Sequence, residues 1–389
     1  MSRSLRIGID NISPGEATSR QGPGGMRVYL QSLLTEFVIQ GPQHQFILFT
    51  PAWADPVLET IPSNVEIVRL PGVPVSRPPR VLYQQTGLAA AIASQRLDVF
   101  FATATVAPLL TKTPVVLAVQ FLQFYEMPEA YGRLRGAYLR YMLPLSLKKA
   151  VSVIIFTEHS KRDLVHWTGV PAEKVSIVPH GLSWDIWRLA EVPQDAPERR
   201  VGAELTAGRP YILYVSSTYG YKNHARLIRA FGLLKRRTNL RHVLLLVGSE
   251  ISVSFDELRM VAKQAGVLED VVFTDRLDHH LAAATYLGAD LAVIPSLYET
   301  FGYPALEAMA CGCPVVTSNS GSMAELAGDA AVLVDPLDED SIADGMERVL
   351  HDRSLHQSLI VRGRQRAKDY TWKRSAARTL EILEEAARA

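Results

Sequence analysis

The feature that most constrains the fold of this chain is a repeated alternation of short apolar runs with segments of helical periodicity. In the first half the runs occupy residues 5–10, 45–50, 65–70, 98–102, 114–119, 151–156 and 175–179. They are rich in β-branched and aromatic residues and have the length of buried strands. The segments between them place apolar residues at helical spacing, as in residues 26–37. Continuous apolar strands that alternate with helices predict a parallel sheet covered by helices on both faces.

The same alternation starts again in the second half of the chain. Its apolar runs occupy residues 210–217, 242–249, 271–275, 289–296, 314–318 and 330–336. The segment 189–209 before them is rich in proline, alanine, glycine and charge and lacks periodicity, which is typical of a linker. A chain of 389 residues is also too long for one compact core. We therefore predict two doubly wound domains, 1–188 and 210–371, and a terminal helix, 372–389, that packs back on the first.

Composition and charge exclude several classes of protein. Hydrophobic residues make up 48% of the chain and the net charge is +1, so no global charge attracts nucleic acid. The two cysteines, Cys311 and Cys313, are too few for a closed zinc site and indicate small buried residues in a reducing compartment. The N-terminus lacks the apolar region of a signal peptide, and no run of about 18 apolar residues occurs. We expect a cytoplasmic protein without a nucleic-acid partner.

The stretch from Ser296 to Val316, SLYETFGYPALEAMACGCPVV, carries the strongest chemical signal. Gly302 lets the backbone approach a ligand, and Pro304 suits the first turn of a helix that we expect to end near Gly312. The N–H groups at such a helix start receive anions. Glu299 lies in the loop before this helix, and Glu307 is expected in its first turn. Donors for phosphate beside two carboxylate acceptors for hydroxyls suit a phosphorylated sugar.

Two further loops at the ends of predicted strands are candidates. Lys222 follows the strand 210–217 and leads into a helix, an ordinary place for a phosphate contact, and Asn223 after it is expected to cap that helix. Gly22, Gly24 and Gly25 separate the first strand from the next helix. They do not form the GxGxxG pattern, which disfavours a nicotinamide-dependent dehydrogenase.

The segment ETFGYPALE, 299–307, resembles the motif of two glutamates separated by seven residues in the retaining glycosyltransferases of family 4. The segments 216–231, 160–181 and 308–336 are similar to the pattern of that family as well, so the resemblance spans nearly the whole chain. The resemblance implies the GT-B fold, in which two Rossmann-like domains face each other across a cleft. The first domain would bind the acceptor and the second the nucleotide sugar.

The resemblance also implies roles for individual residues. Glu299 would bind hydroxyls of the transferred sugar, and Glu307 would hold the ribose of the nucleotide. Lys222 would neutralise the diphosphate. The backbone of Phe301, Gly302 and Tyr303 would approach the donor, and Gly24 and Gly25 would lie beside the diphosphate and the acceptor.

The chain departs from the family pattern at three places. Ser216 stands where an arginine is frequent, which leaves Arg27 or Arg276 to supply a second cation. Gln120 and Phe121 replace a His-Asp pair after the strand 114–119; Gln120 can exchange hydrogen bonds with the transferred sugar but cannot act as an acid or base. The arginine of the glycine loop, Arg27, comes one place early.

The expected activity is transfer of a hexosyl unit, mannose or glucose, from a nucleotide-diphosphate sugar to a glycan or lipid-linked acceptor. By resemblance the donor is GDP-mannose or UDP-glucose and the anomeric configuration is retained. No Asp-x-Asp element occurs in the context of a metal-dependent site, so we expect no metal and no cofactor besides the donor. A nucleotide-sugar epimerase and a catalytically silent sugar-nucleotide-binding protein are the alternatives.

The segment 131–150 mixes five cations with tyrosines and leucines. A basic amphipathic helix of this kind can lie on an anionic membrane, which would place the protein peripherally at its inner face, near a lipid-linked acceptor. A packed helix with solvated cations is the other interpretation.

Overall fold

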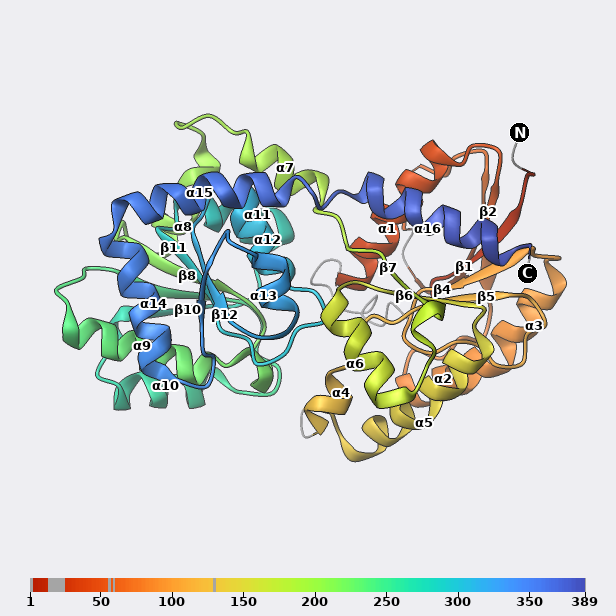
Figure 1. The fold of residues 1–389 in the computed structure, drawn as a ribbon, viewed down its shortest axis with the longest axis horizontal. Helices are drawn as coiled ribbons and strands as arrows, with labels where there is room; N and C mark the ends of the chain where they lie inside the picture. Colours follow the sequence, from red (N-terminus) through yellow and green to blue (C-terminus); the bar gives the residue numbers. More distant parts are fainter. Residues whose placement is uncertain (1–2, 13–24, 55–56, 59, 129–130, 389) are drawn as a thin grey trace. The chain divides into compact units, whose positions relative to one another are not determined.

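The computed structural model describes residues 3–12, 25–54, 57–58, 60–128 and 131–388. The chain forms two compact units, one of residues 1–181 with 371–389 and one of residues 182–370 (Figure 1). This boundary differs from the expected linker 189–209. That segment belongs to the second unit, where short helices pack on one another and Arg199 donates to the carbonyl oxygens of Pro193 and Val192 at 2.9 and 3.1 Å. Its composition resembles a linker, but its polar groups bond to their own unit.

The first unit contains a seven-stranded sheet, ordered β3-β2-β1-β4-β5-β6-β7, in which every paired strand is parallel. Its strands are β1 (Arg6–Asp10), β2 (Gln45–Pro51), β3 (Val65–Leu70), β4 (Val99–Ala102), β5 (Val115–Ala118), β6 (Ser152–Ile155) and β7 (Val175–Ile177). Ile7 lies opposite Phe46 on one side and Val99 on the other, and all three are fully buried. The apolar runs therefore form a sheet covered on both faces, as their composition predicts.

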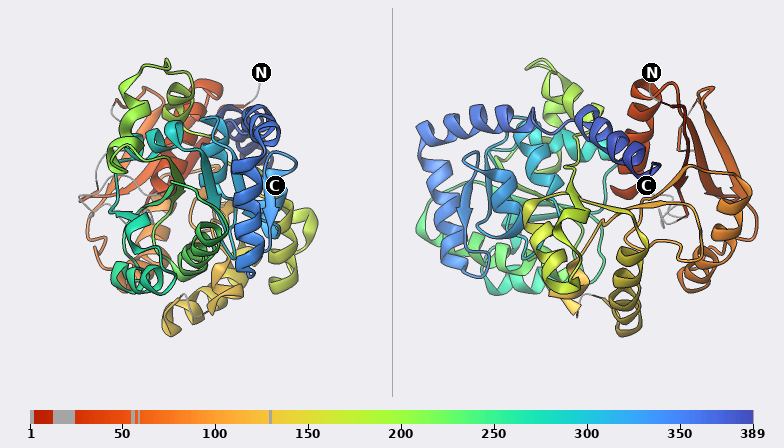
Figure 2. Two further views of the ribbon diagram at one scale, coloured as in Figure 1. Left: turned by 90° about the vertical axis from the view of Figure 1, so that its left-hand side faces the viewer. Right: turned by 45° about the vertical axis from the view of Figure 1, so that its right-hand side comes forward.

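The helices of the first unit include one that is distant in sequence. They are α1 (Gly25–Gln40), α2 (Arg77–Gln85), α3 (Gly87–Ser94), α4 (Gln123–Glu126), α5 (Arg133–Lys149), α6 (Glu158–Thr168) and α16 (Trp372–Ala386). The C-terminal α16 packs alongside α1 (Figure 2). Trp372 contacts Tyr29 and His180 with ring centroids 5.7 Å away from each, and His44 Nε2 lies 3.0 Å from the Glu384 carboxylate.

The second unit contains a six-stranded parallel sheet, ordered β10-β9-β8-β11-β12-β13. Its strands are β8 (Tyr211–Val215), β9 (Val243–Val247), β10 (Val271–Thr274), β11 (Leu291–Ile294), β12 (Val315–Ser318) and β13 (Val332–Val334). Its helices are α7 (Trp184–Ala190), α8 (Val201–Leu205), α9 (His224–Arg237), α10 (Phe255–Gln264), α11 (His279–Ala284), α12 (Tyr303–Ala310), α13 (Gly321–Ala327), α14 (Glu339–His351) and α15 (Arg353–Ala367). Two parallel sheets with helices confirm the predicted α/β class.

The strand order fixes where each unit can bind a ligand. From β8 the chain proceeds outward to β9, whereas from its neighbour β11 it proceeds to β12 on the other side. The loops that leave β8 and β11 therefore diverge, which opens a crevice at the carboxyl ends of these strands. β1 and β4 have the same relationship in the first unit.

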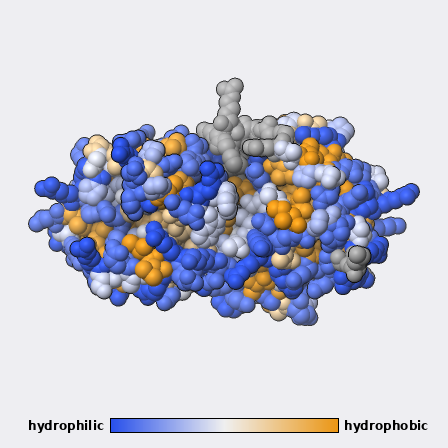
Figure 3. Space-filling model, turned by 90° about the horizontal axis from the view of Figure 1, so that it is seen from above, coloured by the Kyte–Doolittle hydropathy of each residue, from blue (hydrophilic) through white to orange (hydrophobic). Residues whose placement is uncertain are grey.

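The surface is mostly hydrophilic on the face that Figure 3 shows, with apolar side chains gathered in separate patches. In the described part of the chain, no helix combines the length and apolar character that crossing a bilayer requires.

Candidate functional site

Lys222 and Glu299 meet at the divergence of the β8 and β11 loops. Lys222 ends a short 3₁₀ turn, η4 (Gly220–Lys222), and its Nζ atom lies 2.5 Å from Oε1 of Glu299. The side chains are 14% and 10% exposed, so both charges are largely withdrawn from water. Lys222 also lies over the Tyr221 ring, 5.4 Å from its centroid. The structure therefore places a cation and a carboxylate together at the point where this type of sheet binds ligands.

The two loops are held together by a buried tyrosine that the sequence did not single out. The Tyr214 hydroxyl lies within hydrogen-bond distance of the Lys222 carbonyl, at 3.0 Å, and of the Ser296 hydroxyl, at 3.1 Å. The Leu297 N–H donates to the Tyr221 carbonyl at 2.8 Å. Tyr214 is buried in β8, and burial raises the pKa of its hydroxyl. A neutral hydroxyl thus links the Lys222 backbone on one loop to the Ser296 side chain on the other.

Asn223 has a role different from the expected one. It occupies the N-cap position of α9 with a left-handed φ of 66°, but its side chain makes no capping bond. Instead its amide donates to the carbonyl oxygens of Pro295 and Pro336, at 3.0 and 2.7 Å. The N-cap position is as expected, but the side chain does not cap, because its Oδ1 atom instead accepts the Arg226 guanidinium at 2.7 Å.

Helix α12 begins beside this pair. Gly302 precedes it with a φ of 112°, and a β-carbon there would lie 2.6 Å from the Met323 sulfur, so both conformation and space require glycine. Pro304 lies in the first turn, as predicted. Glu307 does not, because the helix starts at Tyr303, and this carboxylate lies in the second turn.

Glu307 is half-buried between polar neighbours. Burial raises the pKa of its carboxyl group, while the nearby His279 and the Tyr286 hydroxyl lower it. His279 is the first residue of α11 and lies 3.4 Å from the Ser183 hydroxyl. His279 and Tyr286 are neighbours of Glu307 that no local pattern predicts.

Phe301 and Tyr303 flank the glycine. The Phe301 side chain is buried, and its ring centroid lies 5.3 Å from that of Tyr303 and 5.8 Å from that of Tyr370. The Phe301 ring therefore anchors the start of α12, and only its backbone is left for the predicted donor contact.

The remaining predicted residues of the second unit are Ser216 and Arg276. Ser216 follows β8, and its hydroxyl donates to the Ser217 carbonyl at 3.2 Å. Gly248 faces it, because a β-carbon at Gly248 would collide with the Ser216 carbonyl. Arg276 follows the edge strand β10, two strands from β8. Where members of the family often carry an arginine, this chain thus has a neutral serine whose hydroxyl bonds to the backbone of the next residue.

In the first unit, Gln120 follows β5 at the carboxyl edge of the sheet. Its N–H donates to the Thr105 hydroxyl at 3.3 Å, and its amide lies near the Tyr29 hydroxyl. Its buried Nε2 atom makes no hydrogen bond to any residue that the structure describes. Gly25 begins α1, and no described atom lies within 4 Å of where its β-carbon would be, whereas Gly22 and Gly24 lie outside the described residues.

Asp10, at the end of β1, is a buried carboxyl group that sequence reasoning missed. It is fully buried, and burial raises its pKa to about 6 although Oδ1 accepts the Ile12 N–H at 2.8 Å. Its carbonyl oxygen accepts the Thr103 hydroxyl at 2.7 Å. The sequence does contain a signal for this residue, because Asp10 is an acid at the end of β1, where the loops that leave β1 and β4 diverge.

Within the described ranges no three His, Cys, Asp or Glu side chains lie close enough together to form a metal site, and Cys311 and Cys313 are free and buried.

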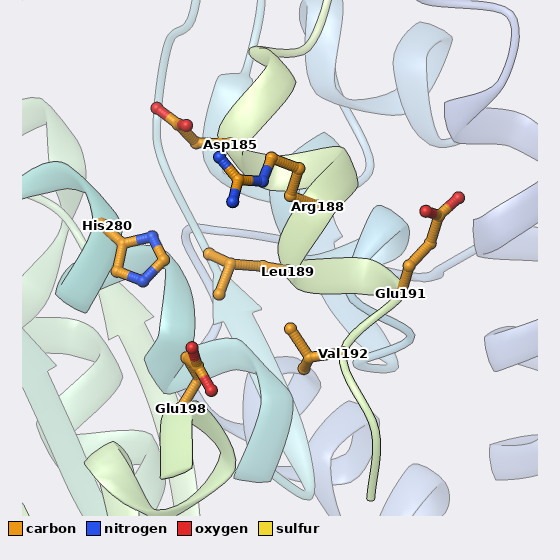
Figure 4. A pocket seen from close by; sticks show the side chains of 7 residues that line it. All are labelled: Asp185, Arg188, Leu189, Glu191, Val192, Glu198 and His280. Atoms are coloured by element: carbon orange, nitrogen blue, oxygen red, sulfur yellow. The ribbon is translucent and has the colours of Figure 1, made fainter. Parts of the chain in front are cut away.

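A pocket of about 390 Å³ lies between α7, the 3₁₀ turn 197–200 and α11 (Figure 4). Its lining residues are Asp185, Arg188, Leu189, Glu191, Val192, Glu198 and His280, none of which the sequence predicted as a site residue.

Two family patterns match the chain and together cover most of it. "Glycosyltransferase Family 4" matches residues 23–184, and "Glycosyl transferases group 1" matches residues 195–366. The chain belongs to this glycosyltransferase family. The family resemblance stated from the sequence is therefore confirmed.

Similar proteins agree with this assignment. The glycosyltransferase is 28% identical over 260 residues to O-antigen chain mannosyltransferase B of Escherichia coli, covering 67% of each chain. It resembles sucrose-phosphate synthase from Thermosynechococcus elongatus with a TM-score of 0.77, 21% identity and 98% coverage of both chains. It resembles Anabaena Alr3699/HepE, solved in complex with UDP and glucose, with a TM-score of 0.74, 19% identity and coverage of 97% and 100%. These structures establish the GT-B fold. The glycosyltransferase spans about two thirds or less of the length of the curated relatives that it matches.

Proposed function

We propose that this glycosyltransferase moves a hexosyl unit from a nucleoside-diphosphate sugar to a glycan or lipid-linked acceptor. The observation that carries the proposal is the Lys222–Glu299 pair at the switch point of the second sheet, beside the start of α12. A phosphate-binding cation and a hydroxyl-binding carboxylate are the two groups that a sugar diphosphate needs.

The proposed donor replaces the ion pair with its own polar groups. Lys222 turns its ammonium to the diphosphate, on which negative charge develops as the glycosidic bond breaks. Glu299 accepts hydrogen bonds from hydroxyls of the transferred sugar. The N-terminal end of α12 adds a positive dipole near the leaving group. Glu307 holds the ribose hydroxyls.

The transfer itself passes through a transition state with cationic character on the sugar. We propose retention at the anomeric carbon and assign no covalent nucleophile. Gln120 offers its unpaired Nε2 donor to a sugar hydroxyl. Charge stabilisation by Lys222 and helix α12 makes the proposed reaction independent of a metal ion, so a chelator should leave turnover unchanged.

The donor is proposed from the relatives. The mannosyltransferase of Escherichia coli supports GDP-mannose, and the Anabaena structure with UDP and glucose supports UDP-glucose. The O-antigen chain in the name of the first of these relatives supports a glycan acceptor, and a lipid-linked acceptor is proposed from the family resemblance.

A thermal-shift screen of UDP-, GDP- and ADP-sugars tests the donor, because a ligand that binds only the native state raises the melting temperature. The best ligand is then supplied in labelled form. Slow hydrolysis, or transfer to added glycan or lipid-linked acceptor, supports the transferase. An isomerised sugar nucleotide would instead identify an epimerase, and binding without turnover a silent binding protein.

A further inference from the structure

Helix α5 of the first unit presents an exposed apolar stripe. Leu134, Ala137, Tyr141 and Leu145 recur at spacings of three and four residues, so they lie on one side of the helix. Leu134 is 89% exposed, Tyr141 70% and Leu145 36%. Figure 1 shows α5, in yellow, at the lower edge of the first unit. Such a continuous row of large apolar side chains on one helix indicates an interaction surface.

The opposite side of α5 is firmly packed. Its buried residues are Gly136, Leu139, Met142, Leu143, Ser146 and Leu147. The Ser146 hydroxyl accepts the Ala107 N–H at 3.1 Å, and the Arg140 guanidinium donates twice to the Phe124 carbonyl, at 3.0 and 2.8 Å. These contacts fix the orientation of the helix about its axis. The exposed stripe is therefore not a face that belongs in the core of the unit.

Cations outnumber acids around the stripe, where the nearby exposed acids are Glu126 of α4, which packs on α5, and Glu173 beside Lys174. Residues 131–150 contain Arg133, Arg135, Arg140, Lys148 and Lys149 and no Asp or Glu, although the whole chain has a net charge of only +1. Arg140 is engaged with the Phe124 carbonyl, which leaves two cations at each end of the helix. Lys174 adds a further ammonium at the C-terminal end, donating to the Leu147 carbonyl at 2.7 Å.

We propose that this α5 face, the stripe with its flanking cations, docks on an anionic lipid membrane. An exposed apolar stripe flanked by cations can lie in the interface, with its apolar side chains among the acyl chains and the cations at the headgroups. A second copy of the chain is disfavoured as the occupant, because two predominantly cationic faces repel each other. The proposal does not rest on the identity of the donor.

Sedimentation of the full chain with vesicles tests this docking. Neutral phosphatidylcholine vesicles are compared with vesicles that contain about one third phosphatidylglycerol. We expect binding to the anionic vesicles alone, weakened at high salt because salt screens the cations. Leu134→Glu with Tyr141→Glu, and separately Arg133→Glu with Arg135→Glu, should each weaken binding at least about tenfold.

The matched control carries two glutamates elsewhere. Met260→Glu with Val361→Glu changes side chains of the second unit that are 54% and 68% exposed, and it should bind vesicles like wild type. Melting temperatures of all variants are compared with wild type, and the two α5 double variants serve as independent probes.

Equal binding to neutral vesicles, no binding to either type of vesicle, or an equal loss of binding in the control variant would overturn the proposal. A concentration-dependent dimer that Leu134→Glu abolishes would assign the face to a second copy. Since no donor is present, failure here leaves the proposed transfer reaction untouched.

Discussion

Nζ of Lys222 lies 2.5 Å from Oε1 of Glu299, although the two residues are 77 positions apart in the sequence. The pair exists because β8 and β11 are neighbours in the sheet while their loops diverge. Each side chain satisfies the other, so neither charge is left uncompensated in a largely desolvated position. A donor with separate phosphate and hydroxyl groups would exchange this one interaction for two.

Lys222→Ala should lower kcat/KM by about 100- to 1000-fold while the protein remains folded, because the charge that develops on the diphosphate loses its cation. Glu299→Gln should cause a loss of similar size by weakening the contacts to the sugar. Steady-state kinetics with the donor found in the screen measures both effects. Lys263→Ala, which removes an exposed lysine from α10, is the control and should be as active as wild type. Wild-type turnover in both site variants would remove this assignment.

Tyr214→Phe should reduce kcat/KM by more than it reduces stability. The change removes the hydroxyl between the Lys222 carbonyl and the Ser296 hydroxyl, at a cost of about 1 kcal/mol in the free energy of unfolding. The loops that carry the pair then lose their common anchor. Tyr211→Phe is the matched control, since Tyr211 is buried in the same strand but bonds to the Thr285 carbonyl at 2.6 Å. Equal kinetic effects of the two variants would contradict the anchoring role.

Gly302→Ala should weaken donor binding and lower the melting temperature. The alanine would be strained at a φ of 112°, and its β-carbon would press on the Met323 sulfur. Adding Met323→Ala removes the steric conflict but not the backbone strain. The double variant should therefore bind donor better than Gly302→Ala and worse than Met323→Ala, as measured by the thermal shift with donor. Full recovery in the double variant would show that backbone conformation is unimportant here.

Asp10→Asn should change how stability depends on pH. Burial raises the Asp10 pKa from 3.8 to about 6, so between these values the folded protein binds a proton that the unfolded chain has released. This group's contribution to the unfolding free energy is therefore full below about pH 4 and falls by about 3 kcal/mol as the pH rises to about 6. In Asp10→Asn that decline should disappear.

Melting temperatures of wild type and Asp10→Asn across about pH 4 to 8 measure this difference. The variant should gain most over wild type at the alkaline end. Asp185→Asn controls for loss of an exposed carboxylate. A constant difference between Asp10→Asn and wild type at every pH would mean that Asp10 titrates alike in the folded and unfolded states.

The sequence by itself determined the α/β class, the presence of two doubly wound sheets and the glycine-proline start of α12. These features depend on residues that are close in the chain, where apolar periodicity and backbone preference act locally. The family resemblance also pointed to Lys222 and Glu299 one at a time. Glu307 was assigned to the correct helix but to the wrong turn, because helix starts depend on details that local patterns leave open.

Only the tertiary structure decided which of these residues meet. The strand order brings Lys222 to Glu299, turns the Asn223 amide toward two loop carbonyls and places Tyr214 between the loops. It also assigns residues 189–209 to the second unit, whereas the packing of the last helix on the first unit was already predicted from the sequence. Such contacts join segments far apart in the chain, and local sequence patterns are compatible with several strand orders. The order is selected by how the buried faces of sheet and helices pack as a whole, which no short stretch of sequence encodes.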